Sequence, residues 1–216
     1  MLVGTRGGAN AAPVTAFVAQ GSPMPFELPA LPYDTKALAP HLSRETVIQR
    51  HSQTQRACVA RLNQLVEGTP WANASLEAIL LGAEGELARQ AAQAWAFIFH
   101  WHSLSPQGGA PDDALGQAIA ARWVDIAGLR QAIATAASDA SPGGWVWLVR
   151  DAQGLEVMAG DVHDLPLSRG LTPLLVHHLT GGQDTDTAAG LDAFWALANW
   201  RFAAANFSGL SAPAAC

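Results

Sequence analysis

The sequence predicts an α+β fold in which an N-terminal antiparallel α-helical hairpin lobe precedes an α/β lobe with a small three-stranded antiparallel sheet. Two long stretches, residues 45–67 and 84–103, carry apolar residues at helical spacing. A later region, residues 145–179, contains short apolar runs separated by turn signals, which is typical of strands. The Gly- and Pro-containing stretch "QGGAPDD" near residue 108 separates the two patterns and marks the boundary between the lobes.

The two long helices form the predicted hairpin. The first is expected to begin near Ser43 or Glu45 and to end near Gly68. The stretch "TPWANASLEAILLG" is expected to be a loop. The second helix lies in "EGELARQAAQAWAFIFHWHSLSP", which is rich in Ala, lacks Pro until Pro106 and is apolar on more than one face. This pattern predicts a buried helix that packs against the first.

The second lobe begins with two short amphipathic helices, in "DDALGQAIAARW" and "DIAGLRQAIATAASDA". A β-hairpin follows, with its turn at Asp151–Gly154, then a strand in "TPLLVHHL" and a closing helix in "TAAGLDAFWALANWRFAAANF". We expect residues 1–23 to be a flexible extension, with Met24 as an alternative start. The expected domains are the helical hairpin, 24–108, and the α/β domain, 109–216.

Composition excludes several classes of protein. The 216 residues include 12 Lys and Arg against 18 Asp and Glu, with no basic patch, so we expect no nucleic-acid partner. No apolar run reaches the roughly 18–20 residues that span a bilayer, so we expect no membrane partner. Two cysteines, Cys58 and Cys216, are too few for a disulfide framework and indicate a reducing compartment. The expected location is the cytoplasm, or the periplasm only if residues 1–23 act as a signal peptide.

Several blocks of sequence resemble one family, in the family's order and at nearly its spacing. The chain resembles the iron/manganese superoxide dismutases, in particular the iron type, from residue 26 to about residue 207. The resemblance implies the two-lobe fold of that family, with one redox metal held between the lobes. The blocks are "FELPALPYDTKALAPHLSRET", "AAQAW", "FHW", "GGWVWLV", "TPLL" and "LDAFWALANWRFAAANF".

In that family three histidines and one aspartate hold iron or manganese, a ligand set that leaves one face of the metal open. Carried over residue by residue, the resemblance places Arg50 and Phe97 at the first two histidines, His178 at the aspartate and Gly182 at the last histidine. Arginine stays protonated and has no lone pair for a metal. Phenylalanine and glycine have no ligand atom. Three of the four positions therefore cannot coordinate a metal.

The resemblance also assigns residues around the former site. Thr54 and Gln55 stand where the family has an adjacent histidine pair, and Cys58 stands where it has a tyrosine at the entrance. Gln93 matches the glutamine that, in iron-type members, hydrogen-bonds the solvent on the metal. Trp145 matches an aromatic residue of the pocket wall.

One interpretation is a filled site without a cofactor. Arg50 supplies a fixed positive charge where the metal was, and Phe97 supplies volume. Arg50 then requires an acceptor, for which Gln93, His178, Asp161 and backbone carbonyls are candidates. The expected pocket consists of Arg50, Gln93, Phe97, His178, Gly182, Trp145 and Cys58.

A second interpretation is a relocated metal site. His163, His178, His100 and Cys58 could converge on the former centre, and such nitrogen and sulfur ligands suit zinc or copper better than the iron or manganese of the family. The charge of Arg50 would repel a divalent cation from this place. A thiolate nucleophile at Cys58, with its pKa lowered by Arg50, is a weaker interpretation than a core cysteine.

Two histidine pairs are too close in sequence to act as chelates. His100 and His102 are two residues apart on a helix and point to different sides. His177 and His178 are adjacent on a strand and point to opposite faces. We expect at most one member of each pair to face the space between the lobes.

Three functions follow as hypotheses. The first is a degenerate pseudoenzyme of the superoxide dismutase family. The second is a metal-dependent superoxide dismutase, or another redox enzyme, with a remodelled histidine site. The third is a structural or interaction module whose protein partner the sequence does not identify. The family's metal-bridging dimer contact falls on Gly181 and Gly182, so we expect a monomer or a non-standard dimer.

Overall fold

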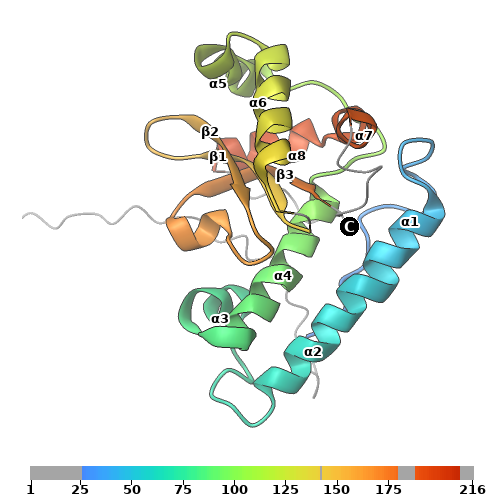
Figure 1. Cartoon of the computed structure of the whole chain (residues 1–216), viewed down its shortest axis with the longest axis vertical. Coiled ribbons are helices and arrows are strands. Elements are labelled where there is room, and N and C mark those ends of the chain that lie inside the picture. The colour runs from blue at the N-terminus through green and yellow to red at the C-terminus, as the bar shows by residue number, and fades with distance from the viewer. Residues whose placement is uncertain (1–25, 142, 180–187, 210–216) are drawn as a thin grey trace, which may run out of the picture.

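A computed structural model of the chain describes residues 26–141, 143–179 and 188–209. It shows a helical hairpin lobe followed by a lobe with a three-stranded antiparallel sheet, so the predicted α+β fold is confirmed (Figure 1). The helices of the first lobe are α1 Arg44–Ile48, the π-helix η1 Gln49–Gln55, α2 Arg56–Val66, α3 Leu76–Gly82 and α4 Gly85–His102. The second lobe comprises α5 Asp113–Trp123, α6 Ile126–Asp139, β1 Trp145–Arg150, β2 Leu155–Gly160, the 3-10 helix η2 Pro166–Arg169, β3 Thr172–His178, α7 Ala188–Leu197 and α8 Trp200–Phe207.

The first predicted helix corresponds to α1, η1 and α2, which follow one another without a break. Ser43 caps its start, since its side chain accepts a hydrogen bond from the backbone N–H of Thr46 at 3.1 Å. The π-helical middle turn was not predicted. Such wide turns interrupt the α-helical spacing locally and are frequent at functional sites.

The second predicted helix is α4, and its bounds agree closely with the expected 84–103. The expected loop between the two helices is in part wrong, because it contains α3. Ser75 caps α3 by accepting a hydrogen bond from the backbone N–H of Ala78. Leu76, Ile79 and Leu80 are buried, so this short helix is stabilised by the apolar face that it packs onto α4.

The sheet has the strand order β2-β1-β3, with β1 antiparallel to both neighbours. The turn between β1 and β2 lies where it was predicted. The Asp151 carboxylate accepts hydrogen bonds from the backbone N–H groups of Gln153 and Gly154, at 2.7 and 2.9 Å. These bonds close the turn and fix the register of the hairpin.

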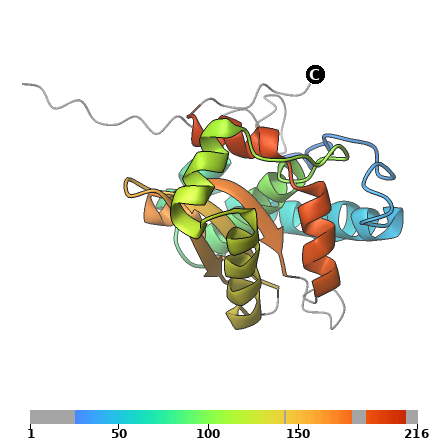
Figure 2. The same ribbon diagram turned by 90° about the horizontal axis from the view of Figure 1, so that it is seen from above.

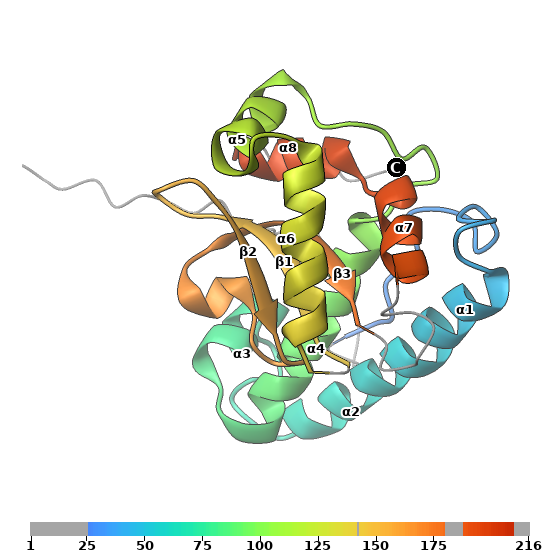
Figure 3. The same ribbon diagram turned by 45° about the horizontal axis from the view of Figure 1, so that its top comes forward.

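Two hydrophobic cores lie on the two faces of this sheet. Residues of β1 alternate between them, because successive side chains of a strand point to opposite faces. Trp145, Trp147 and Val149 belong to the core shared with α2, α3 and α4, whereas Val146 and Leu148 belong to the core shared with α5, α6 and α8. Helix α6 and the hairpin helices accordingly lie on opposite sides of the sheet (Figures 2 and 3).

The closing segment forms two helices instead of the single helix predicted. The chain leaves α7 at Leu197 and begins α8 at Trp200. Asn199 explains the break, because its side chain accepts from the N–H of Phe202 at 3.1 Å and donates to the His102 carbonyl at 2.9 Å. It therefore caps α8 and ties it to the end of α4. Within the described ranges, no helix combines the length and the apolar character that a membrane span requires.

Candidate functional site

The pairing of β1 with β3 determines which histidine faces the hairpin lobe. Trp145 is the partner of His178, and Val146 is the partner of His177. Directly opposite residues share a face of the sheet. The rings of Trp145 and His178 accordingly lie 4.3 Å apart between centroids, while His177 packs against Phe194 of α7 at 5.1 Å. The expectation that the adjacent histidines point to opposite faces is confirmed.

Helix α4 adds two more rings to this place. Phe97 and His100 are three residues apart and so share one side of the helix. The Phe97 ring lies 5.4 Å from the rings of both Trp145 and His178. The His100 ring lies 5.9 Å from each of the same two rings. We call these four residues, Phe97, His100, Trp145 and His178, the ring cluster; it joins the helical hairpin to the sheet.

His102 does not belong to the ring cluster. Its ring packs against Phe202 of α8, at 5.7 Å between centroids. The prediction that His100 and His102 point to different sides of the helix is therefore confirmed.

Both histidines of the ring cluster are neutral near pH 7. Burial, and then the positive charge of Arg50 and the proximity of His177, lower the pKa of His178 from its ordinary value to about 3. Burial is also the main cause that lowers the pKa of His100, followed by His178, Arg50 and His177. Arg50 lies on η1, so the π-helical turn carries a permanent charge whose field acts on both imidazoles.

Several polar atoms of the ring cluster have no hydrogen-bond partner among the described residues. They are Nδ1 and Nε2 of His100, Nδ1 of His178 and Nε1 of Trp145, all inaccessible to solvent. The Val176 backbone raises the pKa of His100, but neither ring nitrogen is in hydrogen-bonding geometry with it. Unpartnered buried polar atoms are rare in proteins, because each costs about 1–3 kcal/mol.

Cys58 lies on α2, where its thiol donates to the carbonyl and side-chain oxygens of Gln90 at 3.6 and 3.4 Å. Burial raises the pKa of Cys58 to about 12. The thiolate interpretation is therefore wrong: the effect of burial is opposite in sign to the activation expected from Arg50, and Cys58 is a buried thiol at neutral pH.

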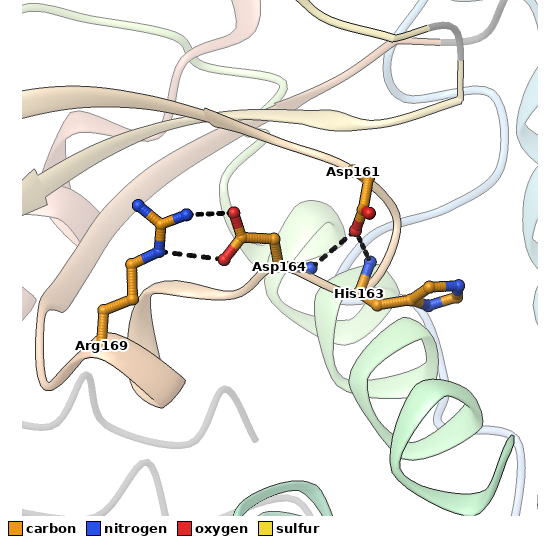
Figure 4. A network of polar contacts seen from close by, with 4 residues as sticks. All are labelled: Asp161, His163, Asp164 and Arg169. Atoms are coloured by element: carbon orange, nitrogen blue, oxygen red, sulfur yellow. Dashed lines mark hydrogen bonds and ion pairs between the residues drawn. The ribbon is translucent and has the colours of Figure 1, made fainter. Parts of the chain in front are cut away.

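His163 is exposed on the turn that follows β2. The backbone N–H groups of His163 and Asp164 donate to the Asp161 carboxylate, and Asp164 pairs with Arg169. Figure 4 shows the His163 ring pointing away from Asp164 and Arg169. The Asp161 carboxylate therefore stabilises the turn after β2 through hydrogen bonds to its backbone.

A polar contact that was not predicted lies beside the ring cluster. The indole N–H of Trp101 donates to the side-chain oxygen of Gln55 at 2.8 Å, and Gln55 is only 1% exposed. Nearby, His51 contacts the Pro29 carbonyl through Nε2 at 2.8 Å. A sequence signal for Gln55 exists, because Gln55, Cys58 and Leu62 follow the apolar spacing of one helix face.

Of the other predicted pocket residues, Gln93 is half-buried on α4. Thr54 donates its hydroxyl to the Gln49 carbonyl at 3.3 Å, within η1. Gly181 and Gly182 lie outside the described residues.

Comparison with known proteins gives the same family for both lobes. The family model "Iron/manganese superoxide dismutases, alpha-hairpin domain" matches residues 25–105, and the model of the C-terminal domain of these enzymes matches residues 111–206. An iron superoxide dismutase of Pseudoalteromonas translucida is 38% identical over 191 residues, which cover 85% of this chain and the whole of the relative. The chain belongs to the iron/manganese superoxide dismutase family.

Other relatives agree. The iron superoxide dismutase of Escherichia coli K12 is 38% identical over 192 residues, covering 86% of this chain and 100% of that protein. That of Coxiella burnetii is 36% identical over 191 residues, covering 85% of this chain and 99% of the relative. Because matches extend over both lobes, membership of the superoxide dismutase family applies to the whole fold.

The described residues around the ring cluster offer few side chains that could bind a metal. In residues 26–141, 143–179 and 188–209, no three His, Cys, Asp or Glu side chains lie together so that they could hold a metal ion. His100 and His178 are neighbours, but the rings closest to them are those of tryptophan and phenylalanine. The donor set that the described part of the chain offers is therefore two neutral imidazoles beside a guanidinium.

Proposed function

We propose that this superoxide dismutase family protein is a pseudoenzyme that lacks the iron or manganese centre of its relatives. Two lobes of the family fold are retained. The residues that the sequence resemblance assigns to the first two ligand positions are Arg50 and Phe97. Neither has a lone pair that can bind a metal at neutral pH.

The position of Phe97 is the observation that carries the proposal. Its side chain is 1% exposed and packs edge-on against both Trp145 and His178. A phenyl ring in this place supplies apolar volume where a metal would need a ligand. Edge-to-face contacts of this kind are worth about 0.5–1.5 kcal/mol beyond the burial of area.

The charge of Arg50 supports the same conclusion. It lowers the pKa values of His100 and His178, so its field disfavours a second positive charge beside either imidazole. A divalent cation would meet this repulsion.

A remodelled histidine metal site is the second candidate. Its favourable observation is the proximity of two neutral imidazoles, His100 and His178, whose ring centroids are 5.9 Å apart. The thiol of Cys58 donates to Gln90, and His163 lies on an exposed turn. Zinc or copper would thus have to bind two imidazoles against the charge of Arg50, which makes this candidate the weaker one.

The proposal is tested by metal content and activity measured on the same sample. The full chain is produced in medium supplemented with iron, manganese, zinc and copper, purified without chelator and analysed for metal per chain. Superoxide dismutation is then assayed beside the iron superoxide dismutase of Escherichia coli. We expect metal far below one ion per chain and no dismutation above the blank. Stoichiometric metal that is lost in a His178→Phe variant would establish the second candidate instead.

Assembly is a separate expectation. Gly181 and Gly182 stand, by resemblance, where the family has the glutamate and histidine of its metal-bridging dimer contact. We therefore propose a monomer or a dimer of non-standard geometry, with no role for nucleic acid or membrane. Sedimentation equilibrium measures this directly. A tight dimer that is broken by a bulky substitution at Gly181 would show that the family interface persists.

A further inference from the structure

A groove runs along the outer side of α6, bordered by the end of α5 and by β2. Figure 3 shows α6 lying in front of the sheet, with α5 at its upper end and β2 beside it. The groove has a volume of about 560 Å³, which is room for several side chains, and it is open to solvent in the described part of the chain. The α6 residues that line it recur every three or four positions and therefore share one side of the helix: Gly128, Gln131, Ala132, Thr135, Ala136 and Asp139.

Small residues make this side of α6 flat. Gly128, Ala132 and Ala136 follow one another at intervals of four residues. A Cβ atom at Gly128 would lie 2.1 Å from the Trp123 carbonyl oxygen, so the start of α6 packs directly on the end of α5. The distance between two packed helices depends on the side chains at their contact, and small residues allow a close approach. The groove therefore has the shape to receive a second helix.

Apolar residues are exposed at the corner between α5 and α6, where the groove begins. The described residues expose three large apolar side chains, and two of them are here: Val124 is 85% exposed and Ile126 is 37% exposed. Val124 also has a φ of 72°, a conformation that a β-branched residue rarely adopts. Holding a residue in such a conformation costs free energy in the isolated chain. Burial of this corner against another molecule would offset that cost.

Opposite charges lie at the two ends of the groove. Arg122 lies at the α5 end, where its guanidinium is 5.6 Å from the centroid of the Trp123 ring, and Asp139 lies in the last turn of α6. Gly128 and Asp139 are about 16 Å apart along the helix, at a rise of about 1.5 Å per residue. Neither Arg122 nor Asp139 forms an ion pair with another described residue. A groove with one positive and one negative end is complementary to a copy of itself that runs in the opposite direction.

We propose that two copies of this chain associate through this groove in a two-fold symmetric dimer, with α6 of each copy packed antiparallel in the groove of the other. Ala132 and Thr135 lie near the middle of the lining side, so the symmetry axis passes beside them. Arg122 then faces Asp139 of the partner subunit, and two-fold symmetry makes this contact twice. Antiparallel packing also brings the positive N-terminal end of one helix dipole to the negative C-terminal end of the other. The inference rests on the non-standard assembly proposed above, whose surface it specifies, and not on the loss of the metal centre.

Sedimentation equilibrium of the full chain, from micromolar to near-millimolar concentration and at low and high salt, measures the association. We expect a reversible equilibrium between monomer and dimer whose dissociation constant rises with salt, because exposed ion pairs are screened. A contact of this small size belongs to the weak, transient class of interfaces. A chain that stays monomeric at every concentration would overturn the proposal, since the groove would then serve a different partner or none.

Charge reversal tests the pairing itself. Arg122→Glu and Asp139→Arg each place like charges at both contacts, so each variant should dimerise about tenfold more weakly than the wild type. An equimolar mixture of the two variants places opposite charges at both contacts of the mixed dimer. We expect the mixture to associate with nearly the wild-type strength, a recovery that altered folding of one variant cannot produce. Failure of the mixture, or of the double variant Arg122→Glu/Asp139→Arg, to recover association would contradict the proposed geometry.

Thr135→Glu and Ala127→Glu form a matched pair on α6. Both replace an exposed residue, but Thr135 lines the groove near the symmetry axis, whereas Ala127 does not line it. Two carboxylates beside the axis would repel each other, so we expect Thr135→Glu to abolish the dimer and Ala127→Glu to retain it, with circular dichroism to check that both variants are folded. Equal association of the two variants would overturn the proposal. A dimer that survives Thr135→Glu but is broken by a bulky substitution at Gly181 would refute the non-standard assembly as well, whereas a monomer refutes only this inference.

Discussion

The lowered pKa values of His100 and His178 lead us to expect that the protein loses stability in mild acid. The folded-state pKa of His178 is about 3, below the ordinary value of 6.5 that the unfolded chain has. Between these values the unfolded state binds a proton that the folded state does not, so stability rises with pH. The contribution of His178 is fully present above pH 6.5 and is lost as the pH falls towards 3.

The size of the loss follows from the linkage relation. One pH unit within this window changes the free energy of unfolding by about 1.4 kcal/mol for each such group. At pH 5, His178 alone lowers the free energy of unfolding by about 2 kcal/mol. His100 adds a loss of the same sign, because its pKa is also lowered by burial. The total free energy of unfolding of a typical protein is only about 5–15 kcal/mol.

The assay is urea denaturation followed by circular dichroism at pH 7.5, 6.5 and 5, for the wild-type chain and for His178→Phe. Phenylalanine keeps a ring among Phe97 and Trp145 and cannot titrate. We expect the variant to lose about 2 kcal/mol less than the wild type between pH 7.5 and 5. His41→Phe, which replaces an exposed histidine outside the ring cluster, is the control and should follow the wild type. Identical pH dependence in wild type and His178→Phe would refute the reasoning.

Three further outcomes are expected. Phe97→Ala should lower the free energy of unfolding by about 3–5 kcal/mol, because the ring is only 1% exposed, and urea denaturation measures this. Phe97→His should bind no metal and show no dismutation while Arg50 remains, which metal analysis and the superoxide assay check. Arg50→Met should raise the pKa of His178, without restoring its ordinary value because burial is the larger cause, and histidine NMR titration measures this. Gln55→Ala should cost about 1–3 kcal/mol, because the indole N–H of Trp101 loses its buried acceptor, and a Gln55→Glu variant that keeps an acceptor is the comparison in the same denaturation assay.

The main architecture could be predicted because its signals are local. Helical spacing predicted the two hairpin helices, and the Asp151–Gly154 turn predicted the β-hairpin that the structure contains. Alternation along β3 predicted that His177 and His178 face opposite sides. Each of these follows from a period of 3.6 or 2 residues, or from a turn residue with a defined hydrogen bond.

The observed secondary structure differs from the predicted one where tertiary contacts outweigh the local sequence pattern. The sequence from α7 to α8 is helical in propensity throughout, but Asn199 bonds both the start of α8 and the end of α4, and this tertiary contact breaks the helix. Helix α3 was missed because seven residues give little periodicity, and its stability comes from packing onto α4. The π-helical turn around Arg50 likewise leaves no signature in the sequence.

The sequence predicted which residues lie at the candidate site, but it did not predict the hydrogen-bonding state of their side chains. Arg50, Phe97 and His178 were singled out through the resemblance, and the ring cluster and the effect of Arg50 on His178 bring them into one neighbourhood. The unpartnered state of the His100 nitrogens depends on the exact placement of rings from α4, β1 and β3. No spacing in the sequence encodes such a three-element arrangement.

The presence of His100 and His178 indicates that the ring cluster does not serve stability alone. An apolar pair of similar volume at positions 100 and 178 would avoid both the buried unpartnered nitrogens and the loss of stability in acid. Phe97 shows that an apolar ring fits this environment, since it already packs against Trp145 and His178. Histidines kept in such a setting carry a thermodynamic cost of the kind found at functional sites. His178→Phe should therefore be at least as stable as the wild type at pH 7.5, and a large destabilisation at that pH would instead make His178 a structural residue.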